Sequence, residues 1–241
     1  VWSMDWRGQG LSGRSLGNPQ KGHIGTFTSY IDDLAWLIDT IGSDDPAGTV
    51  LMGHSMGGHI VLRALLEGRV TAGSAVLTAP MVDLPMRRLR RAAITALCRT
   101  AKMTGLGGRY VTGLGNYDPA QVKFGGNPLS HDPTRFGAIH AAIAATPGVE
   151  MGGPTFGWLD AAFRSIGVLH SLSRAPRNTC PILLCTAMAD TVVSVDAQHT
   201  IASALPTCSQ HLIEGAAHEI LHETDAIRDG FWNAFDGFIA G

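Results

Sequence analysis

Residues 50–59 constrain the fold more than any other part of the chain. They contain Gly53-His54-Ser55-Met56-Gly57, a G-x-S-x-G pattern, between a short apolar run and a helix-like run at residues 60–66. This pattern predicts a nucleophile elbow, a turn so tight that only small residues can flank a strained serine. Ser55 is then the candidate nucleophile. The Met56 N–H, at the first turn of the helix, is a candidate oxyanion donor. The alternative is a glycine-rich turn with an idle serine.

Composition limits what the 241 residues can form. Hydrophobic residues make up 45% of the chain and charged residues 16%, which is typical of a globular protein with a large core. The formal net charge of −2 argues against a nucleic-acid partner. The cysteines lack metal-ligand spacing and are expected to be reduced; they are Cys98, Cys180, Cys185 and Cys208. No apolar run is long enough to span a bilayer, so we expect a cytoplasmic protein whose membrane contact, if any, is peripheral.

Strand-like and helix-like segments alternate in two parts of the chain. Amphipathic spacing predicts a helix at residues 26–41. The end of a strand is expected at residues 1–5, a short apolar strand from residue 50 into the elbow, a buried strand at residues 74–78, and further strands at residues 181–185 and 209–213. Helices are expected after several of these strands, near residues 60–66, 197–205 and 225–239. Residues 85–176 instead show helical patterns and Gly/Pro breaks. We therefore predict an α/β fold with a mostly parallel sheet, divided into core (1–82), helical cap insertion (83–176) and core (177–241).

Three motifs carry a resemblance to a known family. They are the elbow, the glycine-rich loop at residues 5–12, and Gly215-Ala216-Ala217-His218-Glu219-Ile220-Leu221. Together they resemble the monoacylglycerol lipase and lysophospholipase branch of the α/β-hydrolases, of the serine aminopeptidase S33 type. Residues 152–159 of the expected cap also resemble bacterial lysophospholipase L2-type proteins. The resemblance covers nearly the whole chain and implies the α/β-hydrolase fold.

One part of the family pattern is not found in these residues. The resemblance implies three further strands and a His-Gly oxyanion loop before the strand that ends at Asp5. We therefore expect the N-terminal part of the core to be missing, and half of the oxyanion hole with it. Either a gap beside the strand at residue 50 or an unusual pairing of residues 1–4 would follow.

The family resemblance also selects an acid and a base for Ser55. In this fold the chain order is Ser, then Asp or Glu, then His, each after a strand. Asp190 follows the strand that begins near residue 181, and Asp196 is the second choice; a loop aspartate in an Asx-turn is the alternative role. His218 follows the strand that ends near residue 213, through a Gly-Ala-Ala turn. His54 and His59 flank the elbow and are expected to pack or form hydrogen bonds.

A second motif overlaps the candidate base. His218-Glu219-Ile220-Leu221-His222 matches H-E-x-x-H, a zinc-binding helix signature. That signature needs both histidines on one face of a regular helix and a third ligand, whereas His218 is expected in a turn. We therefore expect no metal and no cofactor in the reaction.

A basic helix is expected at residues 85–103. The spacing predicts an apolar face that comprises Met86, Leu89, Ala93, Ile94, Leu97 and Ala101, and a second face with Arg87, Arg88, Arg91, Arg99 and Lys102. A basic amphipathic helix can dock on an anionic membrane, here through Arg87, Arg88 and Arg91. A solvated helix face is the alternative.

These features together predict a serine hydrolase that acts on a small lipid-like ester, a monoacylglycerol or lysophospholipid, through an acyl-enzyme on Ser55. A peptidase or short-chain esterase on the same fold is the nearest alternative, because fold does not fix substrate. A non-catalytic binding module is the alternative from another class.

Overall fold

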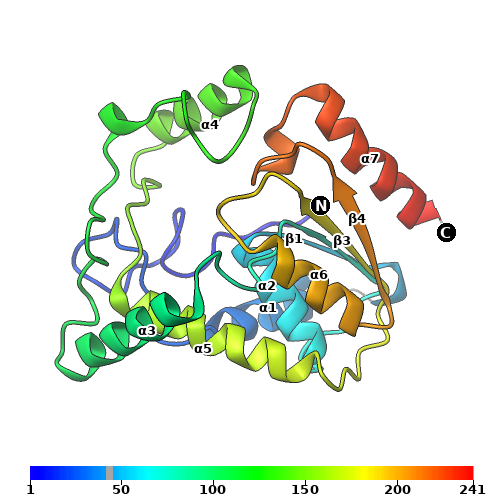
Figure 1. Ribbon diagram of the computed structural model, residues 1–241, viewed down its shortest axis with the longest axis horizontal. Coiled ribbons are helices and arrows are strands. Elements are labelled where there is room, and N and C mark those ends of the chain that lie inside the picture. Colours follow the sequence, from blue (N-terminus) through cyan, green and yellow to red (C-terminus); the bar gives the residue numbers. More distant parts are fainter. Residues whose placement is uncertain (42–45, 241) are drawn as a thin grey trace. The chain divides into compact units, whose positions relative to one another are not determined.

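The computed structural model describes residues 1–41 and 46–240 (Figure 1). Its first elements are helix α1 (Thr28–Ile41), the 3-10 turn η1 (Pro46–Gly48), strand β1 (Val50–His54), helix α2 (Met56–Leu66) and strand β2 (Ser74–Thr78). A helical stretch follows with α3 (Arg88–Met103), η2 (Pro119–Gln121), α4 (Pro133–Ala145) and α5 (Phe156–Leu172). The chain then forms β3 (Ile182–Ala187), α6 (Val195–Ala204), β4 (Cys208–Ile213), η3 (Ile220–His222) and α7 (Asp225–Ala240).

The four strands form one parallel sheet in the order β1-β2-β3-β4. Strands β2 and β3 are almost entirely buried, which is why their sequences read as continuous apolar runs. Helix α2 packs on β1 and β2, and α6 and α7 pack on β3 and β4. Figure 1 shows α6 and α7 on opposite sides of these last two strands. The prediction of a parallel sheet flanked by helices is confirmed.

Strand β1 lies at one edge of the sheet among the residues described. Its neighbour is β2, and the side chains of Val50 and Met52 are exposed. The expected end of a strand at residues 1–5 is wrong, because these residues belong to no strand. Trp2 there is 73% exposed. An extended segment becomes a strand only where its backbone groups pair with a neighbour, and the described chain provides none for residues 1–5.

The contacts divide the chain into two compact units. One comprises Val1–Tyr30, Met86–Lys123 and Gly137–Ser165, and the other comprises Ile31–Pro85, Phe124–Phe136 and Ile166–Gly241. The second unit contains the whole sheet. In the first unit, Phe27 packs edge-on against Tyr30 and Trp158. The three predicted domain segments remain a prediction.

Helix α3, in the first unit, packs differently from its prediction. Cys98 and Ala101 are buried, but Leu89 is 87% exposed and Leu97 is 51% exposed. Arg91 is half-buried, with its guanidinium 5.1 Å from the centre of the Phe163 ring, and Lys102 pairs with buried Asp160 at 3.4 Å. The expected apolar face is therefore partly wrong. The helix is oriented so that the charged ends of two basic residues contact its neighbours, one over an aromatic ring and one in an ion pair.

Candidate active site

The turn after β1 has the strained geometry that its sequence predicts. Ser55 has φ 51° and ψ −115°, a left-handed conformation that is uncommon for residues other than glycine. A Cβ on Gly53 would lie 2.8 Å from the backbone of Gly57, and one on Gly58 would lie 2.9 Å from Pro80. The strand and the helix therefore approach so closely that neither position has room for a side chain.

Hydrogen bonds fix the backbone of Ser55 on both sides of the turn. Its N–H donates to the Thr78 carbonyl at 3.0 Å. Its carbonyl accepts from the N–H groups of His59 and Met81 at 3.0 and 2.9 Å. Met56, the expected oxyanion donor, is the first residue of α2. The hydroxyl of Ser55 is thus placed by the joined ends of β1, β2 and α2.

The structure brings Ser55, His218 and Asp190 together. His218 Nε2 lies 2.9 Å from Ser55 Oγ, and His218 Nδ1 lies 2.7 Å from Asp190 Oδ2. The His218 side chain is 4% exposed and that of Asp190 is fully buried. All three residues belong to the unit that contains the sheet. A buried carboxylate on one ring nitrogen and a serine on the other is the arrangement of an acid–base–nucleophile triad.

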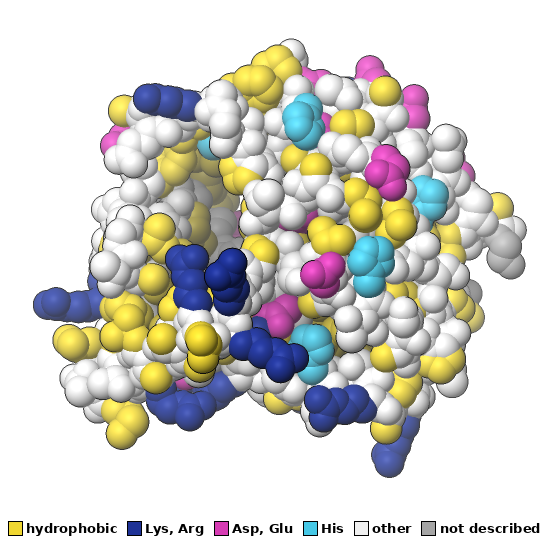
Figure 2. Space-filling model, viewed as in Figure 1, with side chains coloured by type: hydrophobic (Ala, Val, Ile, Leu, Met, Phe, Trp, Pro, Cys, Tyr) yellow, Lys and Arg dark blue, Asp and Glu magenta, His cyan; other side chains and the backbone are white. Residues whose placement is uncertain are grey.

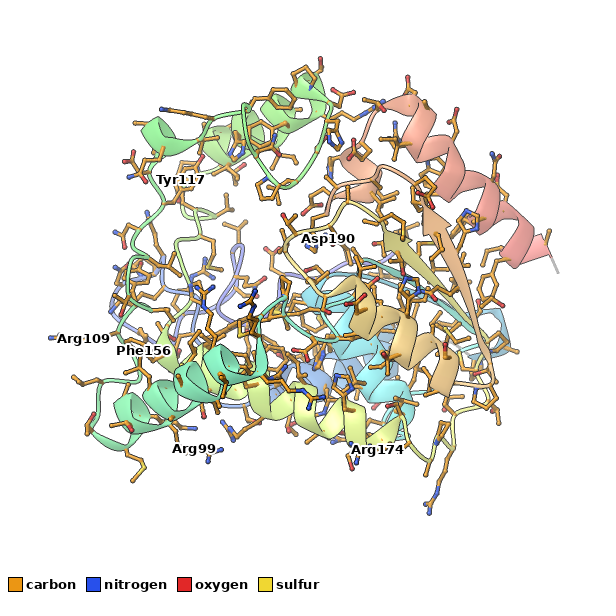
Figure 3. All side chains as sticks on the ribbon, viewed as in Figure 1. Arg99, Arg109, Tyr117, Phe156, Arg174 and Asp190 are labelled. Carbon is orange, nitrogen blue, oxygen red and sulfur yellow. The ribbon has the colours of Figure 1, made fainter. Side chains whose placement is uncertain are left out.

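Asp190 occupies the loop that follows β3 (Figure 3). Its Oδ1 accepts from the N–H groups of Val192 and Val193 at 2.7 and 3.1 Å, while Oδ2 faces His218. Asp190 therefore forms an Asx-turn, which was the alternative role considered from the sequence. It also contacts the imidazole of His218. Asp196 lies exposed in the first turn of α6.

The loop that carries His218 is held by a buried glutamate that sequence reasoning missed. Glu223 is fully buried, and its Oε1 accepts from the Ala217 N–H at 2.7 Å. The same carboxylate contacts the backbone N–H and the ring Nδ1 of His131 at 3.0 and 2.8 Å. The N–H groups of His218 and Glu219 donate to carbonyls of residues 128 and 129 at 3.3 and 2.8 Å. Its sequence neighbourhood does not mark Glu223 as a support of the loop, because one of its partners, His131, lies 92 positions away.

The residues of the H-E-x-x-H motif do not lie on a regular helix. His218 is in the loop, and residues 220–222 form the short turn η3. Glu219 Oε1 lies 3.3 Å from His54 Nε2, and Glu219 Oε2 lies 3.4 Å from His222 Nδ1. Burial raises the pKa of Glu219, but a hydrogen bond from protonated His54, together with the positive charges of His54, His218 and His222, outweighs burial and lowers the pKa to about 2. Glu219 therefore carries its charge at neutral pH.

His59, the second histidine beside the elbow, has a packing role. It is fully buried, and its Nδ1–H donates to the Met81 carbonyl at 2.9 Å. Burial, followed by the nearby charge of Arg63, lowers the pKa of His59 to about 3. The ring is neutral at physiological pH and helps to fix α2 behind the elbow.

The glycine-rich loop near the N-terminus, in the other unit, closes on itself. Asp5 Oδ2 accepts from the Leu11 N–H at 2.8 Å, and the Ser12 hydroxyl donates to the Asp5 carbonyl at 2.7 Å. Gly10 has φ 50°, and a Cβ there would overlap the Asp5 carboxylate. The pattern of residues 5–12 therefore specifies one compact loop.

Comparison with solved structures gives the class of fold. The crystal structure of a monoacylglycerol lipase from Paleococcus ferrophilus superimposes with a TM-score of 0.72 over 98% of this chain and 81% of that one, at 19% identity. The chain has the α/β-hydrolase fold, as its resemblance implied. A family description, "Serine aminopeptidase, S33", matches residues 1–225, and the chain belongs to that family of hydrolases.

Two relatives of this chain have lysophospholipase L2 in their names. The chain is 30% identical over 241 residues to the "Probable lysophospholipase L2" of Haemophilus influenzae, which spans 99% of this chain and 74% of that protein. It is 31% identical over 237 residues to the "Lysophospholipase L2" of Escherichia coli strain K12, with 95% and 68% covered. The expected likeness to lysophospholipase L2-type proteins is confirmed. No helix among the described residues is long and apolar enough to cross a bilayer.

Proposed function

We propose that this chain hydrolyses carboxylic esters of lysophospholipids or monoacylglycerols through an acyl-enzyme on Ser55. The hydrogen-bonded series Ser55–His218–Asp190 carries this proposal. The names of the relatives supply the substrate class, since they include lysophospholipases and a monoacylglycerol lipase. A single acyl chain on a polar headgroup is common to both kinds of substrate.

The geometry supports a definite path for the proton. His218 Nδ1–H donates to Asp190, so the lone pair of Nε2 faces the Ser55 hydroxyl. As Ser55 Oγ attacks the acyl carbon, Nε2 takes its proton, and the buried carboxylate of Asp190 stabilises the imidazolium. The imidazolium then gives the proton to the departing alcohol. Water then attacks the acyl carbon while His218 Nε2 takes one of its protons, and the imidazolium returns that proton to Ser55 Oγ as the acyl–Oγ bond breaks and the fatty acid leaves.

The oxyanion that forms during attack needs hydrogen-bond donors. We propose that the Met56 N–H is one of them, because it begins α2 directly after the nucleophile. The positive end of the helix dipole adds to its attraction for the developing charge.

Two other functions remain as alternatives. A peptidase is the first, since the family description reads serine aminopeptidase. Against it, two relatives at 30% and 31% identity have the name lysophospholipase L2. A non-catalytic binding module is the second, and the short contacts among Ser55, His218 and Asp190 count against it.

A fluorophosphonate probe and a substrate panel test the proposal. We expect the probe to label the wild type and to leave Ser55→Ala unlabelled. We also expect lysophospholipids or monoacylglycerols to be cleaved with higher kcat/KM than aminoacyl amides, in buffer with or without a chelator. An unlabelled wild type would favour the binding module. Faster cleavage of the amides would favour the peptidase.

We further propose that α3 contacts an anionic membrane surface. Its exposed side includes Leu89, Ala93 and Leu97, each four residues after the one before, so they form one stripe along the helix. Exposed Arg88, Arg90 and Arg99 flank this stripe. Figure 2 shows basic and hydrophobic side chains exposed together in the α3 region, and Arg99 points away from the helix in Figure 3. Apolar residues flanked by arginines suit an anionic lipid headgroup layer.

Vesicle binding tests this contact. Changing Arg88, Arg90 and Arg99 to Glu should weaken binding to phosphatidylglycerol vesicles at low salt, where electrostatic attraction is strongest. The matched control changes Arg174 and Arg177, exposed arginines of the other unit, and should bind as the wild type does. Equal binding by all three proteins contradicts the contact.

A further inference from the structure

The H-E-x-x-H motif is only partly used by the proposed triad, which takes His218 and leaves Glu219. The structure adds a third residue to these two from the elbow. A ring nitrogen of His54, a ring nitrogen of His218 and a carboxylate oxygen of Glu219 all lie within 4.8 Å of one another. Two imidazoles and one carboxylate are a frequent ligand set for zinc.

The tautomer of His54 directs a lone pair into this cluster. His54 Nδ1 lies 3.1 Å from the Thr78 carbonyl oxygen and 3.1 Å from the Thr78 hydroxyl. A carbonyl oxygen can only accept, so the contact with it places the proton on Nδ1. When the ring is neutral, His54 Nε2 is then an acceptor, and it is buried 3.3 Å from Glu219 Oε1. In that neutral state two electron-rich atoms face each other, and either a proton on Nε2 or a metal cation between the two atoms would satisfy both.

His218 is prepared in the same way. Its Nδ1–H is directed to the carboxylate of Asp190 at 2.7 Å, so Nε2 offers its lone pair. Histidines that bind metals almost always donate their other ring N–H to a carboxylate or a backbone carbonyl. His218 has the first kind of partner and His54 the second. The tautomer that hydrolysis requires of His218 is thus also the one that metal binding requires.

The cluster lies close to the surface. The side chains of His54 and Glu219 are 30% and 26% exposed, although the Nε2 atom of His54 is itself buried. The Glu219 carboxylate supplies negative charge, and the imidazoles are good ligands for transition metals but poor ligands for Mg²⁺ or Ca²⁺.

We propose that His54, His218 and Glu219 form an inhibitory site for a divalent transition metal, with Zn²⁺ the best match. The ion would take the lone pair of His218 Nε2, the atom that lies 2.9 Å from Ser55 Oγ. That nitrogen could then no longer accept the serine proton, so the acyl-enzyme would not form. Zinc would therefore switch the hydrolase off, whereas a zinc protease needs the ion to act. The inhibition rests on the proposed function, but the binding does not.

Zinc titration of turnover gives the first test. A soluble chromogenic short-chain ester is hydrolysed in metal-free buffer as ZnCl₂ is added. We expect the wild type to lose activity and to regain it on addition of EDTA, while MgCl₂ at the same concentration has no effect. His54→Gln and Glu219→Gln, each compared with its own zinc-free rate, should need roughly 100-fold more zinc for half inhibition, since loss of a ligand should cost at least as much as loss of an outer-shell partner. His199→Gln, a change on α6, should match the wild type.

Calorimetry with ZnCl₂ alone gives a test that does not depend on turnover. Ser55→Ala, which cannot hydrolyse an ester, should bind one zinc ion, and Ser55→Ala combined with His54→Gln should bind it roughly 100-fold more weakly. If the hydrolase proposal failed, this binding would persist. If only the zinc proposal failed, Ser55-dependent turnover would persist.

Two results would overturn the site. One is inhibition of the wild type, His54→Gln and Glu219→Gln at the same zinc concentration. The other is the absence of zinc-dependent heat with Ser55→Ala. Thermal melting checks that each variant is folded. If His54→Gln does not fold, Glu219→Gln replaces it in both the zinc titration and the calorimetry.

Discussion

The elbow of Ser55 and the loop of His218 supply the two ends of one hydrogen bond, but they are held in different ways. The elbow depends on nearby residues: its glycines prevent overlap with Gly57 and Pro80, and its backbone bonds reach no further than Met81. The loop depends on distant residues, because Glu223 joins it to His131, 92 positions away. A reactive group can thus be fixed by the close approach of backbone segments or by a buried carboxylate. The elbow should respond to substitutions of its glycines, and the loop to substitution of Glu223.

The largest expected effect comes from removing either end of the shared hydrogen bond. Ser55→Ala and His218→Ala should each lower kcat/KM for an ester by roughly 10³-fold or more, because neither residue can act without the other. The double variant should be about as slow as either single one. Circular dichroism should show a retained fold. An additive loss in the double variant would mean that the two residues act independently.

Asp190→Asn should follow in size, with a loss of roughly 10²-fold or more in kcat. The amide can keep the Asx-turn through its oxygen but no longer stabilises the imidazolium or holds its tautomer. Steady-state kinetics of Asp190→Asn and Asp196→Asn, measured side by side, checks this prediction. Asp196 is exposed, so its replacement should leave kcat unchanged. The opposite ranking of the two variants would reassign the acid.

Glu223→Gln tests the distant support of the His218 loop. The amide offers one acceptor oxygen in place of two, so either the Ala217 N–H or the His131 N–H loses its bond. We expect about 1–3 kcal/mol lower unfolding free energy, because a buried donor is left unsatisfied. We also expect a lower kcat with little change in KM. Glu214→Gln, exposed just before Gly215, is the matched control and should leave both quantities unchanged.

Gly53→Ala tests the local support of the elbow. The added methyl would lie 2.8 Å from backbone atoms of Gly57 and Gly58, so strand or helix must shift, at a cost of about 1–3 kcal/mol. Gly237→Ala in α7 is the control, because its Cβ meets nothing within 4 Å. That change should stabilise the protein slightly, by about 0.5–1 kcal/mol. Equal unfolding midpoints in urea for the two variants would contradict the steric account.

The last effect concerns pH and is absent at neutral pH. His59 titrates near 6.5 when unfolded and at about 3 when folded, so the unfolded chain binds an extra proton between these values. Its contribution to stability is complete above pH 6.5 and decreases as the pH falls towards 3, by up to about 1.4 kcal/mol per pH unit. His59→Gln can still donate to the Met81 carbonyl but does not titrate. Urea unfolding between pH 7 and 4 should therefore show a flatter slope for the variant, and equal slopes would assign the titration elsewhere.

The same contrast explains what could be predicted from the sequence. The strand–turn–helix around Ser55, the parallel sheet and the positions of its helices follow from short-range patterns, and the structure confirms them. The contacts of Glu223 join segments that no spacing rule connects, so they were missed. The orientation of α3 was misjudged because the charged ends of Arg91 and Lys102 find partners in Phe163 and Asp160, which lie about 60–70 positions away in the sequence. The site roles of Ser55, Asp190, His218 and Met56 remain predictions.

The backbone of Ser55 also limits which amino acids could replace it as the attacking group. At φ 51° a β-branched side chain is a steric outlier, whereas an unbranched one is tolerated. Threonine has the same hydroxyl as serine but adds a methyl group that this turn disfavours. Cysteine has no such branch, so its thiol can occupy the place of the hydroxyl. The elbow thus selects its nucleophile by branching at Cβ before any difference in reactivity matters, and exchange between serine and cysteine is the substitution that this turn would allow in evolution.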